Sequence, residues 1–489
     1  MHGARLVVLS SAALALLVGT SSAQHAGHAP PPPEATTSGK IPITSRSPEA
    51  IAHFLEARAL QEALTPHEAH LHYARALALD PAFALAAYGL GATAPTPRAA
   101  REHLAHAASL AAAGSEGERL LIRALQARLD EGPAAWGAVA ESLVALHPGD
   151  ERAQWMLGSA RSAQGQYAAA IRSYRRALAI APTFALAWNS IGYAERNAGN
   201  AVAAEDAFRQ YIALVPDDPN PYDSYGELLL TLGRFDEAIS QYGRAQAIDP
   251  IFPGSFVGIA SAHALAGRHL EARAEAMRYL EGARDAHERR AALNTLALVE
   301  ADEGDAEAAL AAITRMQAVA ASEGDTASMV QDILLQGELH VLFGRLDEAE
   351  AAFRDADLLA AGSSLSPTQQ VEVGAVTHYG RALVALERGA ADLVAAAVVA
   401  LGATDGSVSR ARELKGRLAL RDAAFARAVG ELEAADGSDP MVLVLQARAH
   451  RGQGHEAVAR RIEASVLGIH RLLDWPLVRA RIALGQPPR

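Results

Sequence analysis

The sequence predicts an all-α protein, an α-solenoid of stacked helix-turn-helix repeats. Proline recurs every 34 residues, at Pro148, Pro182, Pro216 and Pro250. Half of the 489 residues are hydrophobic but only 5% are aromatic, and alanine supplies much of the apolar content. This composition favours closely packed helices over strands, which are enriched in β-branched and aromatic residues. The length alone would suggest about three ordinary domains. A repeat array overrides that expectation, because each repeat packs only on its neighbours.

Small and aromatic residues recur at the same period as the prolines. A glycine on the first helix and an alanine on the second let the two helices approach, because larger side chains would overpack the crossing at a cost of about 1–3 kcal/mol. Another glycine ends the first helix in a left-handed conformation. The aromatic residue fills the gap between successive repeats, and the proline ends the second helix. The series are Gly158, Gly192 and Gly226; Gly165, Gly199, Gly233 and Gly267; Ala170, Ala204, Ala238 and Ala272; and Tyr174, Phe208 and Tyr242.

This pattern resembles the tetratricopeptide repeat family, which is marked by an aromatic residue, a Leu-Gly pair, Ala, Phe or Tyr, Ala and Pro over 34 residues. The resemblance implies a right-handed superhelical α-solenoid. The best-matching repeats are 151–184, 185–218 and 219–252. The second of them contains Trp188, Ile191, Gly192, Gly199, Ala204, Phe208 and Pro216.

Weaker matches continue on both sides of these three repeats. They predict a solenoid over residues 49–484 with about eleven to twelve helix pairs. The phase slips by several residues near 285–289 and near 362–367. We interpret these slips as elongated loops within one array, and two abutting solenoids are the alternative. The segment from Leu472 to Leu484 is expected to cap the C-terminal end, since terminal units of repeat arrays are often atypical.

Residues 1–23 have the pattern of a secretory signal peptide. Arg5 precedes an apolar run over residues 6–18, and small residues follow at 21–23. The thirteen-residue run is too short to span a bilayer core comfortably, so an uncleaved anchor helix is the less favoured alternative. Cleavage after Ala23 would leave a periplasmic or secreted chain with no stable membrane anchor.

Residues 24–48 are predicted to form a disordered linker rich in proline, histidine and serine. His25 and His28 lie before four consecutive prolines at 30–33, and such a composition cannot bury a core. Because histidine-rich tracts bind metals, a metal-binding role for this tail is an alternative. Two histidines on an extended tail make a weak site, so no metal site is predicted.

Charge and cysteine content exclude several classes of function. The formal charge is −12, from 44 basic and 56 acidic residues. Removing Arg5 with the signal peptide leaves 43 basic and 56 acidic residues, so the formal charge becomes −13. This balance argues against a general nucleic-acid binder and against docking on anionic lipid. The absence of cysteine excludes disulfides, thiolate metal sites and cysteine nucleophiles.

No catalytic motif stands out, so the chain is predicted not to be an enzyme and to need no cofactor. A phosphate-binding P-loop, an H-E-x-x-H zinc motif and a G-x-S-x-G elbow are all missing from the sequence. His53, His67, His70 and His72 cluster in the sequence. They are interpreted as a polar helix face or as hydrogen-bonding partners, because a metal site would need a third ligand that the sequence cannot place.

The resemblance implies that the first helix of each repeat lines a concave, peptide-binding groove. Asn189, Tyr193 and Asn197 are four residues apart, so they share one face of a helix. Aromatic and arginine side chains are enriched at binding hot spots. The groove has no lysine and carries acidic residues, which favours a neutral or basic peptide over an acidic tail. The candidate groove residues are Trp155, Asn189, Tyr193, Arg196, Asn197, Asp223 and Glu227.

These observations predict an exported scaffold that binds a protein or peptide partner in its groove and mediates protein–protein interaction in the cell envelope. Two alternatives remain open at this point. One is a periplasmic metal-binding or carrier protein that uses the N-terminal histidines. The other is a sensory solenoid that serves a signalling partner.

Overall fold

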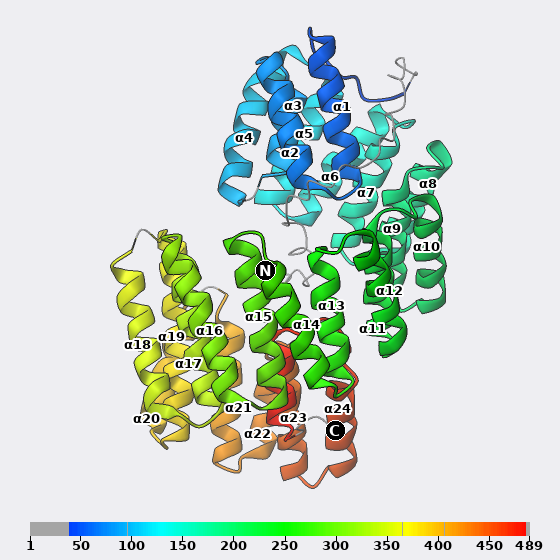
Figure 1. The fold of residues 1–489 in the computed structure, drawn as a ribbon. Coiled ribbons are helices and arrows are strands. Elements are labelled where there is room, and N and C mark those ends of the chain that lie inside the picture. The colour runs from blue at the N-terminus through cyan, green and yellow to red at the C-terminus, as the bar shows by residue number, and fades with distance from the viewer. Residues whose placement is uncertain (1–38, 95, 364, 405, 486–489) are drawn as a thin grey trace. The chain divides into compact units, whose positions relative to one another are not determined.

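The computed structural model describes residues 39–94, 96–363, 365–404 and 406–485. Over these ranges the chain forms twenty-five α-helices and no strand (Figure 1). The predicted fold class, an all-α helical repeat solenoid, is therefore confirmed. None of the helices in these ranges combines the length and the hydropathy that a membrane crossing needs.

The chain divides into two compact units. The N-terminal unit contains the described residues up to 228 together with 240–252, and the C-terminal unit contains 229–239 and 253–485. The boundary falls within two helices, α11 (Pro219–Thr231) and α12 (Phe235–Ile248).

The N-terminal unit is a stack of antiparallel helix pairs. Each odd-numbered helix packs against the even-numbered helix that follows it, and several odd-numbered neighbours also contact each other. The odd-numbered helices therefore line the inner face of the stack. The helices are α1 (Pro48–Glu62), α2 (Pro66–Leu79), α3 (Ala84–Ala92), α4 (Pro97–Leu110), α5 (Glu116–Asp130), α6 (Pro133–Leu146), α7 (Glu151–Ala163), α8 (Tyr167–Ile180), α9 (Ala185–Asn197) and α10 (Ala201–Leu214).

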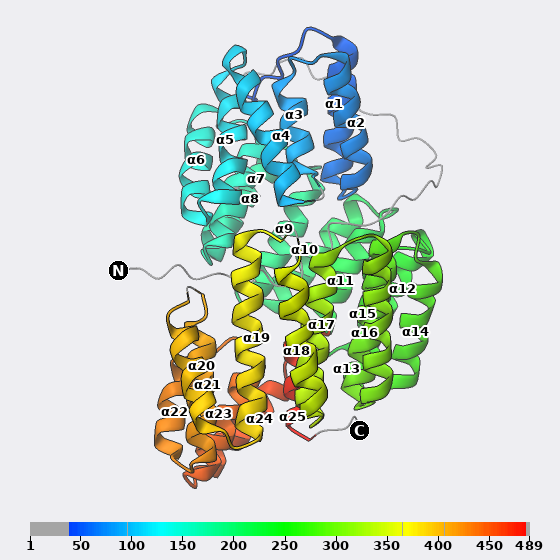
Figure 2. The ribbon, with the colours of Figure 1, turned by 90° about the vertical axis from the view of Figure 1, so that its left-hand side faces the viewer.

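The C-terminal unit repeats this arrangement and adds a single unpaired helix, α25, at its end (Figure 2). Its helices are α13 (Pro253–Leu265), α14 (His269–Gly282), α15 (Ala286–Glu303), α16 (Ala306–Ser322), α17 (Thr326–Leu342), α18 (Leu346–Ala361), α19 (Pro367–Glu387), α20 (Ala391–Gly402), α21 (Val408–Arg421), α22 (Phe425–Glu433), α23 (Pro440–Gly452), α24 (Glu456–Leu467) and α25 (Trp475–Ala483).

Glycines on the first helix of a pair provide the space for an aromatic ring on the second. A methyl group added to Gly192 would lie 2.6 Å from the Phe208 ring, which is fully buried. The turn glycines Gly165 and Gly199 have φ angles of 73° and 82°, so they end their helices in the left-handed region as expected. The same close packing joins Gly158 to Tyr174, Gly226 to Tyr242 and Gly337 to Phe353.

We expect Gly192→Ala to destabilise the N-terminal unit by about 1–3 kcal/mol, because the added methyl group overlaps the Phe208 ring. This cost outweighs the roughly 1 kcal/mol by which alanine is favoured over glycine in a helix. Gly243→Ala on α12 is the control, since nothing lies within 4 Å of a methyl group there. Urea unfolding should show a gain in stability for the control. Equal gains for both variants would contradict the packing argument.

The slips in repeat phase have a different structural cause from the one expected. Instead of elongated loops, the helices themselves are longer: α15 has 18 residues, α17 has 17 and α19 has 21. The connection between α14 and α15 is only residues 283–285. An extra turn in each helix lengthens the repeat without adding a loop, and proline spacing alone cannot distinguish the two.

Part of the expected disordered linker, residues 39–47, instead packs without helical structure along the N-terminal unit. Backbone N–H groups of this segment donate to carboxylates at the ends of successive repeats. Each carboxylate accepts a hydrogen bond that the segment would otherwise make with water. Composition cannot reveal such partners, and residues 24–38 lie outside the described residues. The hydrogen bonds join Ile41 to Asp150 (3.0 Å), Thr44 to Glu118 (2.8 Å) and Arg46 to Asp80 (3.1 Å).

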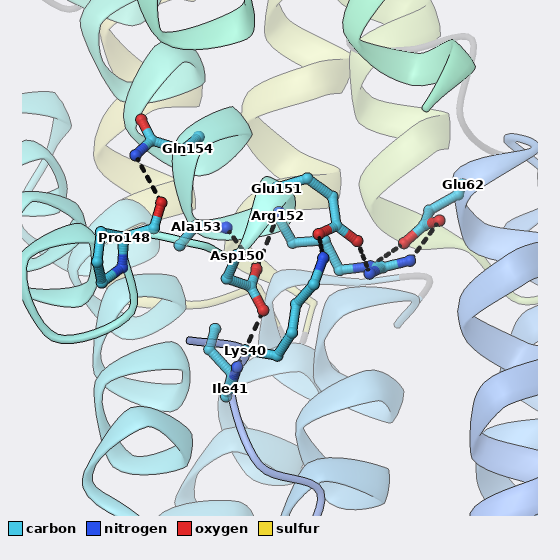
Figure 3. Close-up of polar contacts among 9 residues, drawn as sticks. All are labelled: Lys40, Ile41, Glu62, Pro148, Asp150, Glu151, Arg152, Ala153 and Gln154. Carbon is cyan, nitrogen blue, oxygen red and sulfur yellow. Dashed lines mark hydrogen bonds and ion pairs between the residues drawn. The ribbon is translucent and has the colours of Figure 1, made fainter. Parts of the chain in front are cut away.

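An ion-pair chain fixes the start of this segment to α7 and α1 (Figure 3). The Lys40 ammonium contacts the carboxylate of Glu151. Arg152 contacts Glu151 as well, and its Nε lies 2.5 Å from Oε1 of Glu62 on α1. Asp150 also caps α7 by accepting from the Arg152 backbone N–H at 2.9 Å.

Candidate functional site on the inner face of the N-terminal unit

Three of the predicted groove residues form one connected cluster between α9 and α11. The Tyr193 hydroxyl donates to Oε2 of Glu227 at 2.9 Å, and Nη1 of Arg196 donates to Oε1 of the same carboxylate at 2.7 Å. The Arg196 guanidinium also lies 4.7 Å from the centre of the Tyr193 ring. This geometry holds the aromatic face and the cation together on the inner side of the stack.

Asp223 lies one turn before Glu227 on α11 and has an unusual protonation state. Burial, together with the nearby Glu227 carboxylate, raises the pKa of Asp223 to about 8. At neutral pH this carboxyl is therefore mostly protonated, and its Oδ1 has no hydrogen-bond partner. The buried hydroxyl of Tyr242 on α12 also has no partner, and burial with the nearby Asp223 raises its pKa well above the usual value.

This protonation corrects the expected acidic character of the groove. Glu227 is neutralised by Arg196, and Asp223 is held neutral by burial. Asp223 and Glu227, the two acidic residues on which the expectation of a neutral or basic peptide depends, therefore contribute little net charge at pH 7. The inner face around α9 and α11 instead offers hydrogen-bonding groups in a largely neutral setting.

The other predicted residues take separate roles. Asn189 on α9 is only 7% exposed, and its side-chain carbonyl oxygen has no partner. The Trp155 indole N–H on α7 donates to Oγ of Ser190 at 2.8 Å, which ties one repeat to the next. Asn197 is exposed at the end of α9. The expected row of Asn189, Tyr193 and Asn197 is therefore not one uniform surface, because burial decreases along the helix.

Sequence reasoning did not include Tyr242 and Ser224 in the site. Tyr242 was assigned to the aromatic series that fills the core, and its ring does pack against Gly226. Its hydroxyl nevertheless reaches the polar cluster, where Asp223 and Glu227 affect its pKa. Ser224 lies 3.3 Å from the Tyr193 hydroxyl. The four-residue step that selects Asp223 and Glu227 passes over Ser224. The signal that could have found it is Ser190, which lies 34 residues earlier, at the same position of the preceding repeat.

The raised pKa of Asp223 predicts a pH-dependent stability. The folded chain holds this proton up to about pH 8, whereas the unfolded chain loses it near the ordinary value of 3.8. The protonated Asp223 side chain therefore contributes fully to the free energy of unfolding below about pH 4, and this contribution is lost as the pH rises towards 8. Asp223→Asn should become steadily more stable relative to the parent from pH 5 to pH 8, as measured by urea unfolding. Asp206→Asn, whose side chain is 68% exposed, should leave the slope unchanged.

Three histidines of the N-terminal unit, His53, His70 and His72, act as hydrogen-bonding partners. Nδ1 of His70 lies 2.9 Å from Oγ1 of Thr93, and Nδ1 of His53 lies 3.4 Å from Nδ1 of His72. Over the part of the chain that the structure describes, no three histidine or acidic side chains are close enough to hold a metal ion. His25 and His28 lie outside the described residues.

Family comparison agrees with the helix-pair geometry. The family model for the tetratricopeptide repeat matches residues 137–185, 155–219 and 225–287. The chain contains tetratricopeptide repeats. Arrays of this repeat are generally non-catalytic scaffolds that bind other proteins. The matched residues include all of α7, α8, α9 and α10, and the third match begins within α11.

Solved structures with the same kind of repeat resemble parts of this chain. A tetratricopeptide repeat protein from Parabacteroides merdae is 12% identical, covering 61% of this chain and 98% of that one, with a TM-score of 0.35. PilF from Pseudomonas aeruginosa is 18% identical, and the match covers 46% of this chain and 96% of PilF, with a TM-score of 0.33. A tetratricopeptide repeat protein from Thermus thermophilus is 21% identical, and the match covers 37% of this chain and 96% of that one, with a TM-score of 0.30. No curated protein sequence matches the chain.

Proposed function

We propose that this chain is an exported scaffold that holds an extended segment of a partner protein on the inner face of its N-terminal unit, in the cell envelope. The observation that carries the proposal is a pair of unsatisfied polar groups on that face. Asn189 offers a buried carbonyl oxygen without a partner, and Asp223 offers a protonated carboxyl whose Oδ1 is also free.

Buried polar groups are normally hydrogen-bonded, and leaving one unpaired costs about 1–3 kcal/mol. Both oxygens are closed to solvent in the free chain. An extended peptide presents alternating N–H and C=O groups, and it would pair with both side chains once they turn towards the inner face. The Asn189 oxygen would accept from a backbone N–H, and the protonated Asp223 would donate to a backbone C=O. Because Glu227 is already neutralised, a neutral segment fits this face better than a strongly charged one.

Site-specific photo-crosslinking in the native envelope tests this function. The probe belongs at Asn197, because this residue is exposed and lies one turn beyond Tyr193 on the same helix. A photo-reactive residue there should trap a reproducible protein partner. The control position is Val202 on α10, which is 76% exposed on the second helix of the same repeat. Identical products from both positions, or none from Asn197, would argue against binding on the inner face.

A matched pair of substitutions identifies the recognition group. Asn189→Ala should lower the crosslinking yield from position 197 by at least about fivefold, which corresponds to a loss of about 1 kcal/mol of binding free energy. Asn200→Ala removes an exposed asparagine of the same repeat and should leave the yield unchanged. If both variants crosslink as well as the parent, Asn189 does not recognise the partner.

Export rests on Arg5, the apolar run over residues 6–18 and the small residues at 21–23. N-terminal sequencing of the protein from envelope and medium fractions tests it. The expected mature chain begins at Gln24. Recovery of the chain from cytoplasm with residues 1–23 retained would overturn the proposed location but not the protein-binding function.

A further inference from the structure

The inner face of the C-terminal unit is covered by the chain's own C-terminal segment, residues 469–485. The backbone N–H of Leu473 donates to Oγ of Ser261 on α13 at 3.0 Å. The Trp475 indole N–H donates to Oδ1 of Asn294 on α15, also at 3.0 Å. The segment therefore does more than cap the last repeat, because it reaches helices about 180–210 residues earlier in the sequence.

Two arginines of α25 pair with acidic side chains of this face. Arg481 makes a two-point contact with Asp302 of α15, at 2.5 Å and 3.1 Å, and the Asp302 side chain is fully buried. Nε2 of His269 lies 3.0 Å from Oδ2 of the same carboxylate, the oxygen that Nη2 of Arg481 also contacts. Arg479 donates to Oε2 of Glu338 on α17 at 2.5 Å. Without α25, the face would present Asp302 and Glu338 as acidic groups beside apolar side chains.

The apolar contacts complete a helix-binding site. Leu477 and Val478 are fully buried and belong to one hydrophobic cluster with Leu296 of α15 and Leu339 of α17. On the opposite side, Nη2 of Arg448 on α23 donates to the carbonyl of residue 483 at the end of α25, at 2.6 Å. The surrounding helices thus recognise an aromatic residue, two aliphatic residues and two arginines.

Nothing in the repeat pattern requires α25. It has no partner helix, and a non-helical connection over residues 468–474 separates it from α24. A helix of nine residues is marginal by itself, so its structure depends on the face that binds it. A tethered ligand of this kind is held at an effective concentration in the millimolar range.

We propose that the inner face of the C-terminal unit is a second binding groove, specific for a short basic helix with aliphatic anchors, and that residues 469–485 are its resident ligand. A partner helix with the same order of anchors binds there by replacing α25. This site is independent of the face around Asn189, and it differs in its ligand, because its acidic residues select arginine.

Binding of a labelled peptide to the full-length chain tests the proposal. The probe is a fluorescein-labelled synthetic peptide of residues 469–485, followed by fluorescence anisotropy. Exchanging Arg479 and Arg481 for glutamate in the protein should release α25, so the peptide should bind this variant at least about tenfold more tightly than the parent. The control exchanges Arg460 and Arg461 for glutamate, two exposed arginines of the neighbouring α24, and should behave as the parent.

A reversible tether excludes indirect effects of the exchanged charges. The chain has no cysteine, so Ser261→Cys with Leu473→Cys introduces a single pair of thiols, at two residues joined by a 3.0 Å contact between the Leu473 backbone nitrogen and Oγ of Ser261. Mass spectrometry first verifies that this pair forms a disulfide. In the charge-exchanged protein, oxidation should abolish peptide binding and reduction should restore it. Equal binding to parent and variant, or no binding to a variant that keeps its helical circular dichroism, would overturn the proposal.

Hydrogen exchange of the parent chain tests whether α25 can leave the inner face, and it does so even if the glutamate variant does not fold. Amides of residues 477–483 should exchange through local release, faster than those of α15 and α17 around them. If they exchange only together with α15 in a global unfolding step, α25 is a permanent part of the core and the proposal fails. Crosslinking from position 197 should not change in any of these variants, so the two proposed sites are tested separately.

Discussion

Replacing Phe353 by alanine is expected to lower the free energy of unfolding of the C-terminal unit by about 3–5 kcal/mol. The ring is fully buried between two repeats. It packs against Gly337 of its own helix pair and against Gly380 of the next one, and neither glycine has a side chain that could fill the space left behind. A cavity at this position would therefore persist and would weaken both the pair and its junction.

Guanidinium unfolding measured by far-UV circular dichroism checks this value. Leu358→Ala is the control on the same helix α18, because this leucine is 66% exposed. The control should change stability by no more than about 0.5 kcal/mol. A loss for Phe353→Ala that is no larger than the control would show that the repeats do not depend on the ring.

Replacing Arg290 by methionine is expected to cost about 3–5 kcal/mol at pH 7, because it leaves the Asp332 carboxylate buried and unpaired. Nη1 and Nη2 of Arg290 contact the two oxygens of Asp332 at 2.6 Å and 3.0 Å, and only 4% of the Asp332 side chain is exposed. Burial already raises the pKa of Asp332 in spite of the arginine. Without the arginine that pKa rises further, so the loss should be larger at pH 8 than at pH 5.

Two comparisons isolate this ion pair. Arg98→Met removes an exposed pair in which the arginine side chain is 90% exposed, and it should cost at most about 0.5 kcal/mol. The double variant Arg290→Met with Asp332→Leu removes both charges and should recover most of the lost stability. If the double variant is no more stable than Arg290→Met, the loss comes from packing and not from the unpaired carboxylate.

The fold could be predicted because every repeat carries the same local signals. The turn glycine at 199 must adopt a positive φ, and the glycine at 192 must leave room for Phe208; both requirements are visible as a 34-residue recurrence. Irregular repeats were predicted less well. The longer helices α15, α17 and α19 shift the phase in the same way as longer loops would.

The site could be predicted only in part, because the repeat places side chains on a face but does not set their environment. The resemblance to the tetratricopeptide repeat implies Asn189, Tyr193, Arg196, Asp223 and Glu227, because they lie on the first helices of their repeats. It could not show that Arg196 neutralises Glu227, or that burial keeps Asp223 protonated. Both facts depend on how closely α9, α11 and α12 approach, and they favour a neutral ligand, where the sequence predicts a neutral or basic one.

The sequence by itself determined the helices, their pairing and the turns, since these follow from interactions between residues at most one repeat apart. Only the tertiary structure decided where the two ends of the described chain lie. Residues 39–47 run along the repeat ends from Asp150 to Asp80, and residues 469–485 cover the inner face near Ser261 and Asp302. Neither segment belongs to the repeat, and each is held by partners far away in the sequence. No periodic pattern encodes such contacts, because they form only after the stack has brought those partners together.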